Sequence, residues 1–130
     1  MRVAPQPVEI TAGRTAEGVV KLTIQGGYHT NANPASYPYL IATELDLPDA
    51  GDITVDYIYY PNPLIKKFPF AEKPLRVYEG ETPLTINLQA AQTAAKGKRT
   101  LPAKLHIQAC DDQVCYAPGT IEVAIPVTIK

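Results

Sequence analysis

Apolar and polar residues alternate with a period of two along most of the chain. The two longest alternating segments cover residues 101–109 and 121–129. Shorter segments, rich in β-branched and aromatic residues, cover 20–25, 41–47, 53–60, 75–78 and 84–88. Side chains of a strand point alternately to the two faces of a sheet, so this period predicts strands with one buried face. Because turns containing glycine or proline separate the segments, the sequence predicts an all-β fold, an antiparallel β-sandwich.

The segments outside this pattern carry little helical signal. Residues 89–96 are rich in alanine but short and are followed by Gly97, so we expect a loop or a single turn there. The whole chain, 1–130, is predicted to be a single domain, long enough to bury a core. Residues 1–7 contain two prolines and no apolar leader core, and we interpret them as linker-like. They favour a domain of a longer exported precursor over a cytosolic protein.

Composition excludes several classes of function. Lysine and arginine total 12 and aspartate and glutamate total 13, a formal charge of −1, so no basic field attracts nucleic acid or an anionic membrane. No Gly-x-Ser-x-Gly motif, paired carboxylates or metal-binding motif indicates a hydrolase. We expect no cofactor, no metal and a monomeric domain.

Cys110 and Cys115 are the only cysteines, and four residues separate them. A turn between them would place both sulfurs at the mouth of a hairpin. As a structural staple, the pair would contribute about 2 kcal/mol, because it closes a loop of only about six residues. A metal site would need further ligands, and the chain contains only His29 and His106 as histidines. A redox dithiol is the third interpretation. At this point it has the same weight as the structural disulfide.

The alternation predicts which way Cys110 points. In residues 101–110, Lys104, His106 and Gln108 share the phase of Cys110, opposite the apolar residues. Regular alternation would therefore place Cys110 on the polar face, which favours a reactive pair over a buried structural one. His106 lies about 13 Å along the strand from Cys110 at roughly 3.3 Å per residue. We interpret it as a surface histidine.

Residues 61–74 form the other unusual segment. They join two predicted strands without a strand pattern and contain both phenylalanines of the chain, Phe68 and Phe70. Connections of this length inside a compact domain are usually functional or mobile. A hinged aromatic would shield a disulfide from stray thiols and uncover it for a partner. The alternative is that the two rings pack into the end of the sandwich, and one ring can do so while the other stays on the loop.

The segments around Gly26-Gly27-Tyr28-His29 and Cys110 to Tyr116-Ala117-Pro118 resemble a known family. Over about residues 8–129 the chain is similar to the N-terminal, or alpha, domain of the disulfide reductase DsbD. The resemblance implies an immunoglobulin-like fold in the periplasm. It implies protein-disulfide reductase activity within a larger thiol:disulfide interchange protein, serving processes such as cytochrome c biogenesis. Electrons would come from a thioredoxin-like domain, fed by a membrane-embedded transporter to which this domain can be fused, and would pass to periplasmic disulfide proteins.

The resemblance also implies residue roles. Cys115 would form mixed disulfides with partners, and Cys110 would resolve them. The segment before Val77-Tyr78 corresponds in position to the family's cap loop. Its cap aromatic would be Phe70, with Phe68 as the second choice.

Three further residues are candidates for tuning the thiols: Asp111, Asp112 and Tyr116. The two carboxylates would disfavour a thiolate and raise the pKa of the cysteines; plain turn formation is the alternative role for them. The competing function is a non-enzymatic, immunoglobulin-like binding or adaptor module that carries a structural disulfide.

Overall fold

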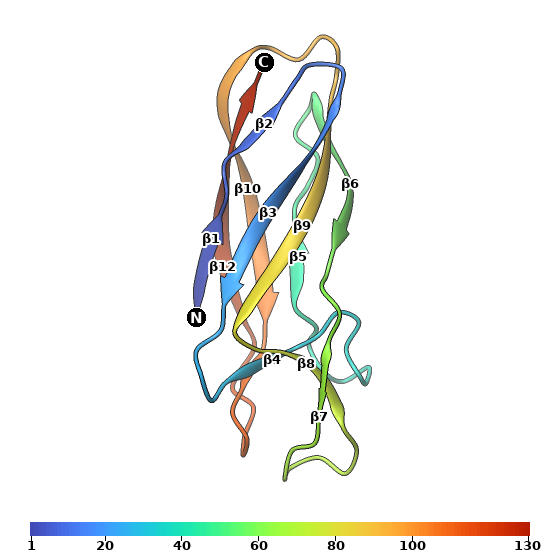
Figure 1. The fold of residues 1–130 in the computed structure, drawn as a ribbon, viewed down its shortest axis with the longest axis vertical. Helices are drawn as coiled ribbons and strands as arrows, with labels where there is room; N and C mark the ends of the chain where they lie inside the picture. The colour runs from blue at the N-terminus through green and yellow to red at the C-terminus, as the bar shows by residue number, and fades with distance from the viewer.

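The computed structural model describes residues 1–130 and confirms the predicted all-β, immunoglobulin-like sandwich (Figure 1). It contains no helix, and none of its segments could cross a bilayer as one. Its strands are β1 (Arg2–Pro5), β2 (Val8–Ile10), β3 (Thr15–Thr23), β4 (His29–Asn31), β5 (Glu44–Asp46), β6 (Ile53–Tyr59), β7 (Leu64–Lys66), β8 (Leu75–Tyr78), β9 (Glu81–Ala90), β10 (Gly97–Ile107), β11 (Ala109–Cys110) and β12 (Gly119–Ile129).

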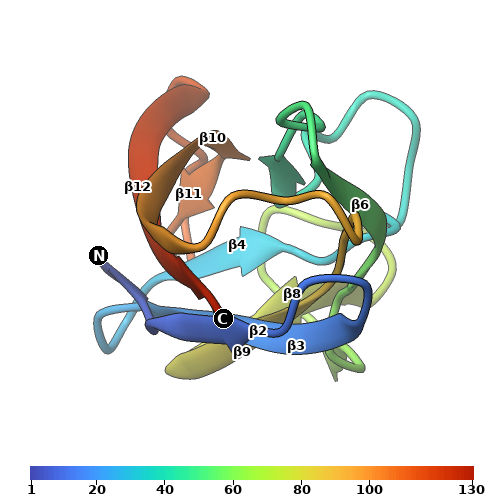
Figure 2. The same cartoon turned by 90° about the horizontal axis from the view of Figure 1, so that it is seen from above.

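Two of the three four-stranded sheets form the sandwich. One has the strand order β1-β3-β9-β6 and the other β2-β12-β10-β5. In the view from above, β10 and β12 form one wall and β3 and β9 another (Figure 2). β10 and β12 pair in an antiparallel register from Gly97 opposite Ile129 to Ile107 opposite Gly119. Among the named strands, only β2 and β12 pair in parallel.

The core lies between these two sheets and follows the predicted alternation. In β9, Leu84, Ile86 and Leu88 are all fully buried, while Thr85 and Asn87 between them are only partly buried. A hydrophobic cluster of 19 residues results, contributed by both sheets. Burial of one face of each strand is therefore the main force that fixes the register of the sandwich.

Gly18 in β3 marks a close approach between strands. A Cβ atom at this position would lie 2.5 Å from Val8 Cγ2 and 3.1 Å from Ile86 Cγ1. We expect Gly18→Ala to destabilise the domain by about 1–3 kcal/mol, because an extra methyl group overpacks the core. Urea unfolding measures this loss. Gly119→Ala is the control, since a Cβ atom at that position would have nothing within 4 Å; equal unfolding midpoints for the two variants would contradict the prediction.

The third sheet, of order β11-β4-β8-β7, lies at one end of the sandwich (Figure 1). The chain enters it from both main sheets. β10 continues into β11 after Gln108, and β8 continues into β9 after Glu79 and Gly80. Gly80 has a φ of +63°, a backbone conformation that glycine adopts without steric cost. The small sheet, which we call the end sheet, is thus joined covalently to both layers.

Three expectations from the sequence differ from the structure. Residues 61–74 do contain a strand, β7, which pairs with β8; all three of its side chains are exposed, so it shows no alternation. Residues 2–5, interpreted as linker-like, form β1 and pair with β3. In 41–47, only residues 44–46 form a strand. Of residues 89–96, for which a loop or a single turn was expected, 91–96 form a turn and loop, whereas Gln89 and Ala90 belong to β9.

Candidate functional site

Cys110 and Cys115 are joined by a disulfide at the end of the sandwich. They face each other as an isolated antiparallel bridge, with Cα atoms 4.0 Å apart. Backbone hydrogen bonds flank the pair: the Tyr116 amide donates to the Ala109 carbonyl at 2.9 Å, and the Asp111 amide donates to the Val114 carbonyl at 2.9 Å. The predicted hairpin with both sulfurs at its mouth is confirmed.

Asp111 organises the turn between the cysteines. Its Oδ1 accepts hydrogen bonds from the backbone amides of Gln113, at 2.8 Å, and Val114, at 2.7 Å. Its Oδ2 accepts one from the Tyr116 hydroxyl at 2.8 Å. These hydrogen bonds lower the pKa of Asp111, and the bonded carboxylate raises the pKa of Tyr116. The contacts fit the turn-forming role for Asp111, whereas Asp112 is exposed.

The two cysteines differ in exposure. Cys110 has an exposed fraction of 0%, whereas Cys115 is exposed. Cys115 lies outside regular strand pairing, which resumes only at Gly119, after Pro118. The predicted placement of Cys110 on the polar face is wrong. The alternation that carried this prediction ends at Ile107, where β10 leaves its sheet.

Gln108 lies at this change of sheet, between β10 and β11. Its Oε1 accepts hydrogen bonds from Asn31 Nδ2 at 3.3 Å and from the Ile41 amide at 3.4 Å, and its Nε2 donates to the Tyr116 carbonyl at 3.3 Å. The next residues form β11, which pairs with β4 instead of continuing the β10 ladder. The alternation of buried and exposed side chains in β10 is therefore not continued into β11, and the side chain of Cys110 is buried.

His29 lies directly opposite Cys110 in the β4–β11 ladder. Its side chain is 1% exposed, and its Nε2 has no hydrogen-bond partner. Directly opposed residues in antiparallel strands share a face, with Cβ atoms about 4.5–5.5 Å apart. The importance of His29 is not evident from the sequence, because all three residues of β4 are buried and show no alternation.

His106, the other histidine, lies away from the disulfide. It is in β10, and its Nδ1 lies 3.0 Å from Thr120 Oγ1 on the neighbouring strand. The side chain is partly exposed, in line with its interpretation as a surface residue.

The two phenylalanines occupy different environments over His29. Phe68 is 7% exposed and packs with Leu75 and Val77, whereas Phe70 is 41% exposed. The ring centroids of His29 and Phe68 lie 4.2 Å apart, and those of Phe68 and Phe70 lie 5.4 Å apart, in a stacked arrangement. One ring thus packs into the end of the molecule while the other remains on its surface.

Two lysines hold the segment that carries these rings. Lys66 of β7 forms an ion pair with Glu79 at 2.9 Å. Lys67 Nζ donates hydrogen bonds to the carbonyls of Phe68, at 3.0 Å, and Ala71. β7 pairs only with β8, so the segment is attached to the end sheet along one edge.

Cys115 opens into an apolar cavity of about 780 Å³, which we call the cap groove. Phe70 and Val114 line it, as do Tyr37 and Tyr39, whose rings stack with centroids 5.4 Å apart. Cys110 is not among the lining residues. The groove therefore brings together the exposed cysteine and one of the two predicted cap residues.

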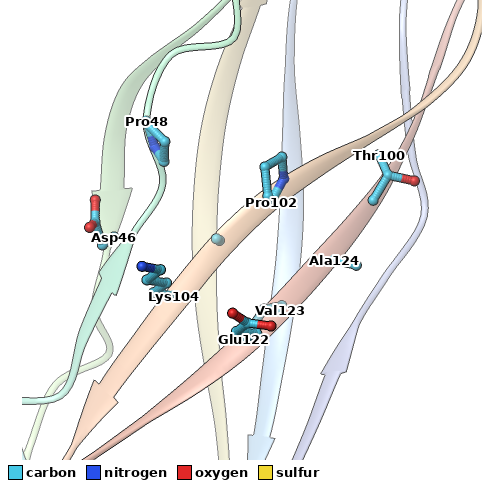
Figure 3. A pocket seen from close by; sticks show the side chains of 9 residues that line it. Asp46, Pro48, Thr100, Pro102, Lys104, Glu122, Val123 and Ala124 are labelled. Atoms are coloured by element: carbon cyan, nitrogen blue, oxygen red, sulfur yellow. The ribbon is translucent and has the colours of Figure 1, made fainter.

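A second hollow, of about 490 Å³, lies on the outer face of the sheet formed by β5, β10 and β12 (Figure 3). Asp46, Lys104 and Glu122 border it. Lys104 is about 20 Å along the strand from Cys110 at roughly 3.3 Å per residue, and no cysteine, histidine or aromatic side chain lines the hollow. It takes no part in the disulfide site.

Comparison with solved structures supports the fold. The N-terminal domain of DsbD from Neisseria meningitidis, in its reduced form, is 17% identical, with a TM-score of 0.56 over 89% of this chain and 86% of that chain. A periplasmic chaperone, SfaE, is 12% identical with a TM-score of 0.38, covering 99% of this chain and 56% of that chain. A search of curated proteins found no match.

The family comparison covers nearly the whole molecule. Residues 3–126 match the family model described as "Thiol:disulfide interchange protein DsbD, N-terminal". The match includes the end sheet, the cap groove and both cysteines of the disulfide. A disulfide-forming pair within such a match is consistent with a thiol–disulfide exchange module. The chain belongs to the family of DsbD N-terminal domains.

Proposed function

We propose that this domain carries electrons by reversible opening of the Cys110–Cys115 disulfide. The observation that carries the proposal is the asymmetry of the pair: Cys115 is exposed in the wall of the cap groove, and Cys110 is fully buried. A thiol–disulfide exchange needs one sulfur that a partner can reach. Cys115 supplies that sulfur, and Cys110 is the resolving cysteine.

The exchange proceeds in two displacements at sulfur. A thiolate of the reduced donor attacks Cys115 Sγ, the bond between Cys115 and Cys110 breaks, and Cys110 leaves as a thiolate that takes up a proton. A second thiolate of the donor then attacks the donor's first sulfur, the one bonded to Cys115 in the mixed disulfide. The donor's own disulfide forms, and Cys115 is released as a thiolate. The donor is oxidised by two electrons, and the domain becomes a dithiol. Reduction of an acceptor disulfide follows the same steps in reverse.

Hydrogen bonds stabilise the hairpin in addition to its disulfide. This supports reversible opening of the disulfide. The carboxylate of Asp111 and two flanking backbone hydrogen bonds fix the turn. Closure of so short a loop contributes only about 2 kcal/mol. The domain therefore stays folded when the disulfide opens, and a purely structural function for this bond would stabilise little.

The partners follow from membership of the family. We infer a thioredoxin-like domain as the electron donor, disulfide proteins of the periplasm as acceptors, and fusion to a membrane-embedded transporter as the route by which electrons arrive. Asp112 lies in the turn between the two cysteines, and Tyr116 directly follows Cys115. We infer that they and Asp111 tune the reactivity of the thiols.

The redox potential tests this proposal. Equilibration with glutathione buffers is expected to give a potential above about −300 mV, the value below which structural disulfides typically lie. Reduction by a thioredoxin-like donor should proceed without loss of the β-sheet circular dichroism. The double variant Cys110→Ser, Cys115→Ser is the control for changes unrelated to the disulfide. A potential below this limit, with no reduction by the donor, would favour the adaptor module with a structural disulfide.

A further inference from the structure

We propose that His29 is the proton acceptor for Cys110 when this cysteine resolves a mixed disulfide. The inference rests on the proposed function, because it concerns the resolving step of that exchange. It assigns a chemical role to a buried histidine that the disulfide alone leaves unexplained.

The position of His29 is the first argument. It is the register partner of Cys110 in the β4–β11 ladder, so the two side chains lie on one face at neighbouring positions. Both are sealed from solvent, with exposed fractions of 1% and 0%. A thiol buried in this way cannot transfer its proton directly to water, and burial raises a thiol pKa. His29 is the titratable side chain opposite it in the ladder.

The unpartnered Nε2 of His29 is the second argument. Buried polar atoms are nearly always hydrogen-bonded, and an orphaned one carries a desolvation penalty. The oxidised domain has no proton on either cysteine, so its disulfide offers no hydrogen to this nitrogen. Opening the disulfide creates an S–H group on Cys110, opposite the imidazole. The atom that lacks a partner in the oxidised state gains a donor in the reduced state.

The surroundings of His29 suit a base that is neutral at rest. Burial, the largest influence, lowers its pKa, and Lys66 of β7 lowers it further. Glu79, between β8 and β9, and Asp111, in the hairpin, act in the opposite direction. A neutral imidazole has a free lone pair for the thiol proton. The two carboxylates then stabilise the imidazolium that forms.

In the resolving step, Cys110 displaces the partner sulfur from Cys115. The mixed disulfide joins Cys115 to the partner. The proton of Cys110 moves to Nε2 of His29, the sulfur of Cys110 bonds to Cys115 Sγ, and the partner sulfur leaves with the electron pair of the broken bond. The imidazolium of His29 then passes its proton to the departing partner thiolate. Phe68, stacked on the imidazole at 4.2 Å, keeps the ring in place during the transfer.

An aromatic disulfide reagent, dithiobis(nitrobenzoate), separates the steps. Added to the reduced domain, it forms a mixed disulfide at Cys115 and releases one coloured thiolate. Attack by Cys110 then releases a second. We expect His29→Phe to slow the second release at least about tenfold near pH 7, since a general base contributes about 10²–10⁴-fold. The first release should stay within about twofold of the wild type, because Cys115 meets solvent directly.

The pH profile distinguishes proton transfer from a structural role. The wild-type second release should be nearly constant from about pH 7 to 8, because burial lowers the pKa of His29 from its ordinary value of about 6.5 and the neutral imidazole accepts the proton internally. In His29→Phe it should rise about tenfold per pH unit below the thiol pKa, as the thiolate fraction rises. His29→Gln keeps a polar side chain but cannot hold the proton, so it should behave as His29→Phe does. His106→Phe, which alters the exposed histidine, should match the wild type.

Parallel pH profiles in the wild type and His29→Gln would overturn the assignment. So would a wild-type second release that itself rises about tenfold per pH unit, a result that needs no variant to fold. Loss of the first release in the wild type would instead contradict the role of Cys115 and the proposed function. The two failures are therefore distinguishable in one experiment.

Discussion

Cys110→Ala, with Cys115 first converted to a mixed disulfide by dithiobis(nitrobenzoate), is expected to trap a stable mixed disulfide with a thioredoxin-like partner that lacks its own resolving cysteine. The partner thiolate attacks Cys115 Sγ, and the nitrobenzoate thiolate leaves with the electron pair of the broken bond. Cys115→Ala is treated in the same way. With both resolving sulfurs absent, no thiolate remains to expel either protein. Cys115 lines the cap groove, where a partner can approach it. Non-reducing electrophoresis and intact-mass measurement should show most of the limiting protein in the complex.

Cys115→Ala is the matched variant and should trap far less. Its remaining cysteine, Cys110, is fully buried and faces His29 from β11. Exchange rates depend on access to the attacking sulfur, so we expect at least about tenfold less complex in the same time. If Cys115→Ala trapped the partner as well as Cys110→Ala did, the roles of the two cysteines would be reversed.

Removal of both cap rings is expected to expose the disulfide site to small thiols. Phe70 lines the groove that contains Cys115, and Phe68 stacks beneath it. In the variant Phe68→Ala, Phe70→Ala, reduction of the disulfide by glutathione should accelerate by about tenfold or more, because Phe70 narrows the groove through which a thiol approaches Cys115 and access controls the rate of exchange. Unchanged rates would leave these rings without a shielding role.

The single variants separate shielding from stability. Phe70 is 41% exposed, so Phe70→Ala should change access with a small effect on the free energy of unfolding. Phe68 is 7% exposed, and Phe68→Ala should cost about 3 kcal/mol, near the lower end for a buried phenylalanine. Tyr57→Ala is the control, since Tyr57 is a 46% exposed aromatic on β6, in another sheet. It should alter neither quantity.

The long strands were predictable because each buries one face. Burial alternates over the whole of β9, from Leu101 to Leu105 in β10 and from Val123 to Ile129 in β12, and this period is directly visible in the residues. The end sheet lacks such a signal. β4 is buried at every position and β7 is exposed at every position, so tertiary pairing, and not local pattern, makes them strands.

The same dependence on tertiary pairing separates the features of the site that the sequence predicted from those that it did not. The spacing of the cysteines and the turn residues between them predicted the hairpin. The burial of Cys110 accompanies the pairing of β11 with β4, next to three hydrogen bonds from Gln108 to other segments of the chain. The place of His29 opposite Cys110 depends on a ladder between segments that are far apart in the sequence, which no local pattern encodes.

The end sheet also has a consequence for how such domains diversify. Its strands contribute no residue to the 19-residue cluster that holds the sandwich together. Substitutions in residues 67–74 or around Tyr37 and Tyr39 therefore change the surface at this end while the long strands still fold. Related domains can differ in this surface and keep the same disulfide hairpin and the same core.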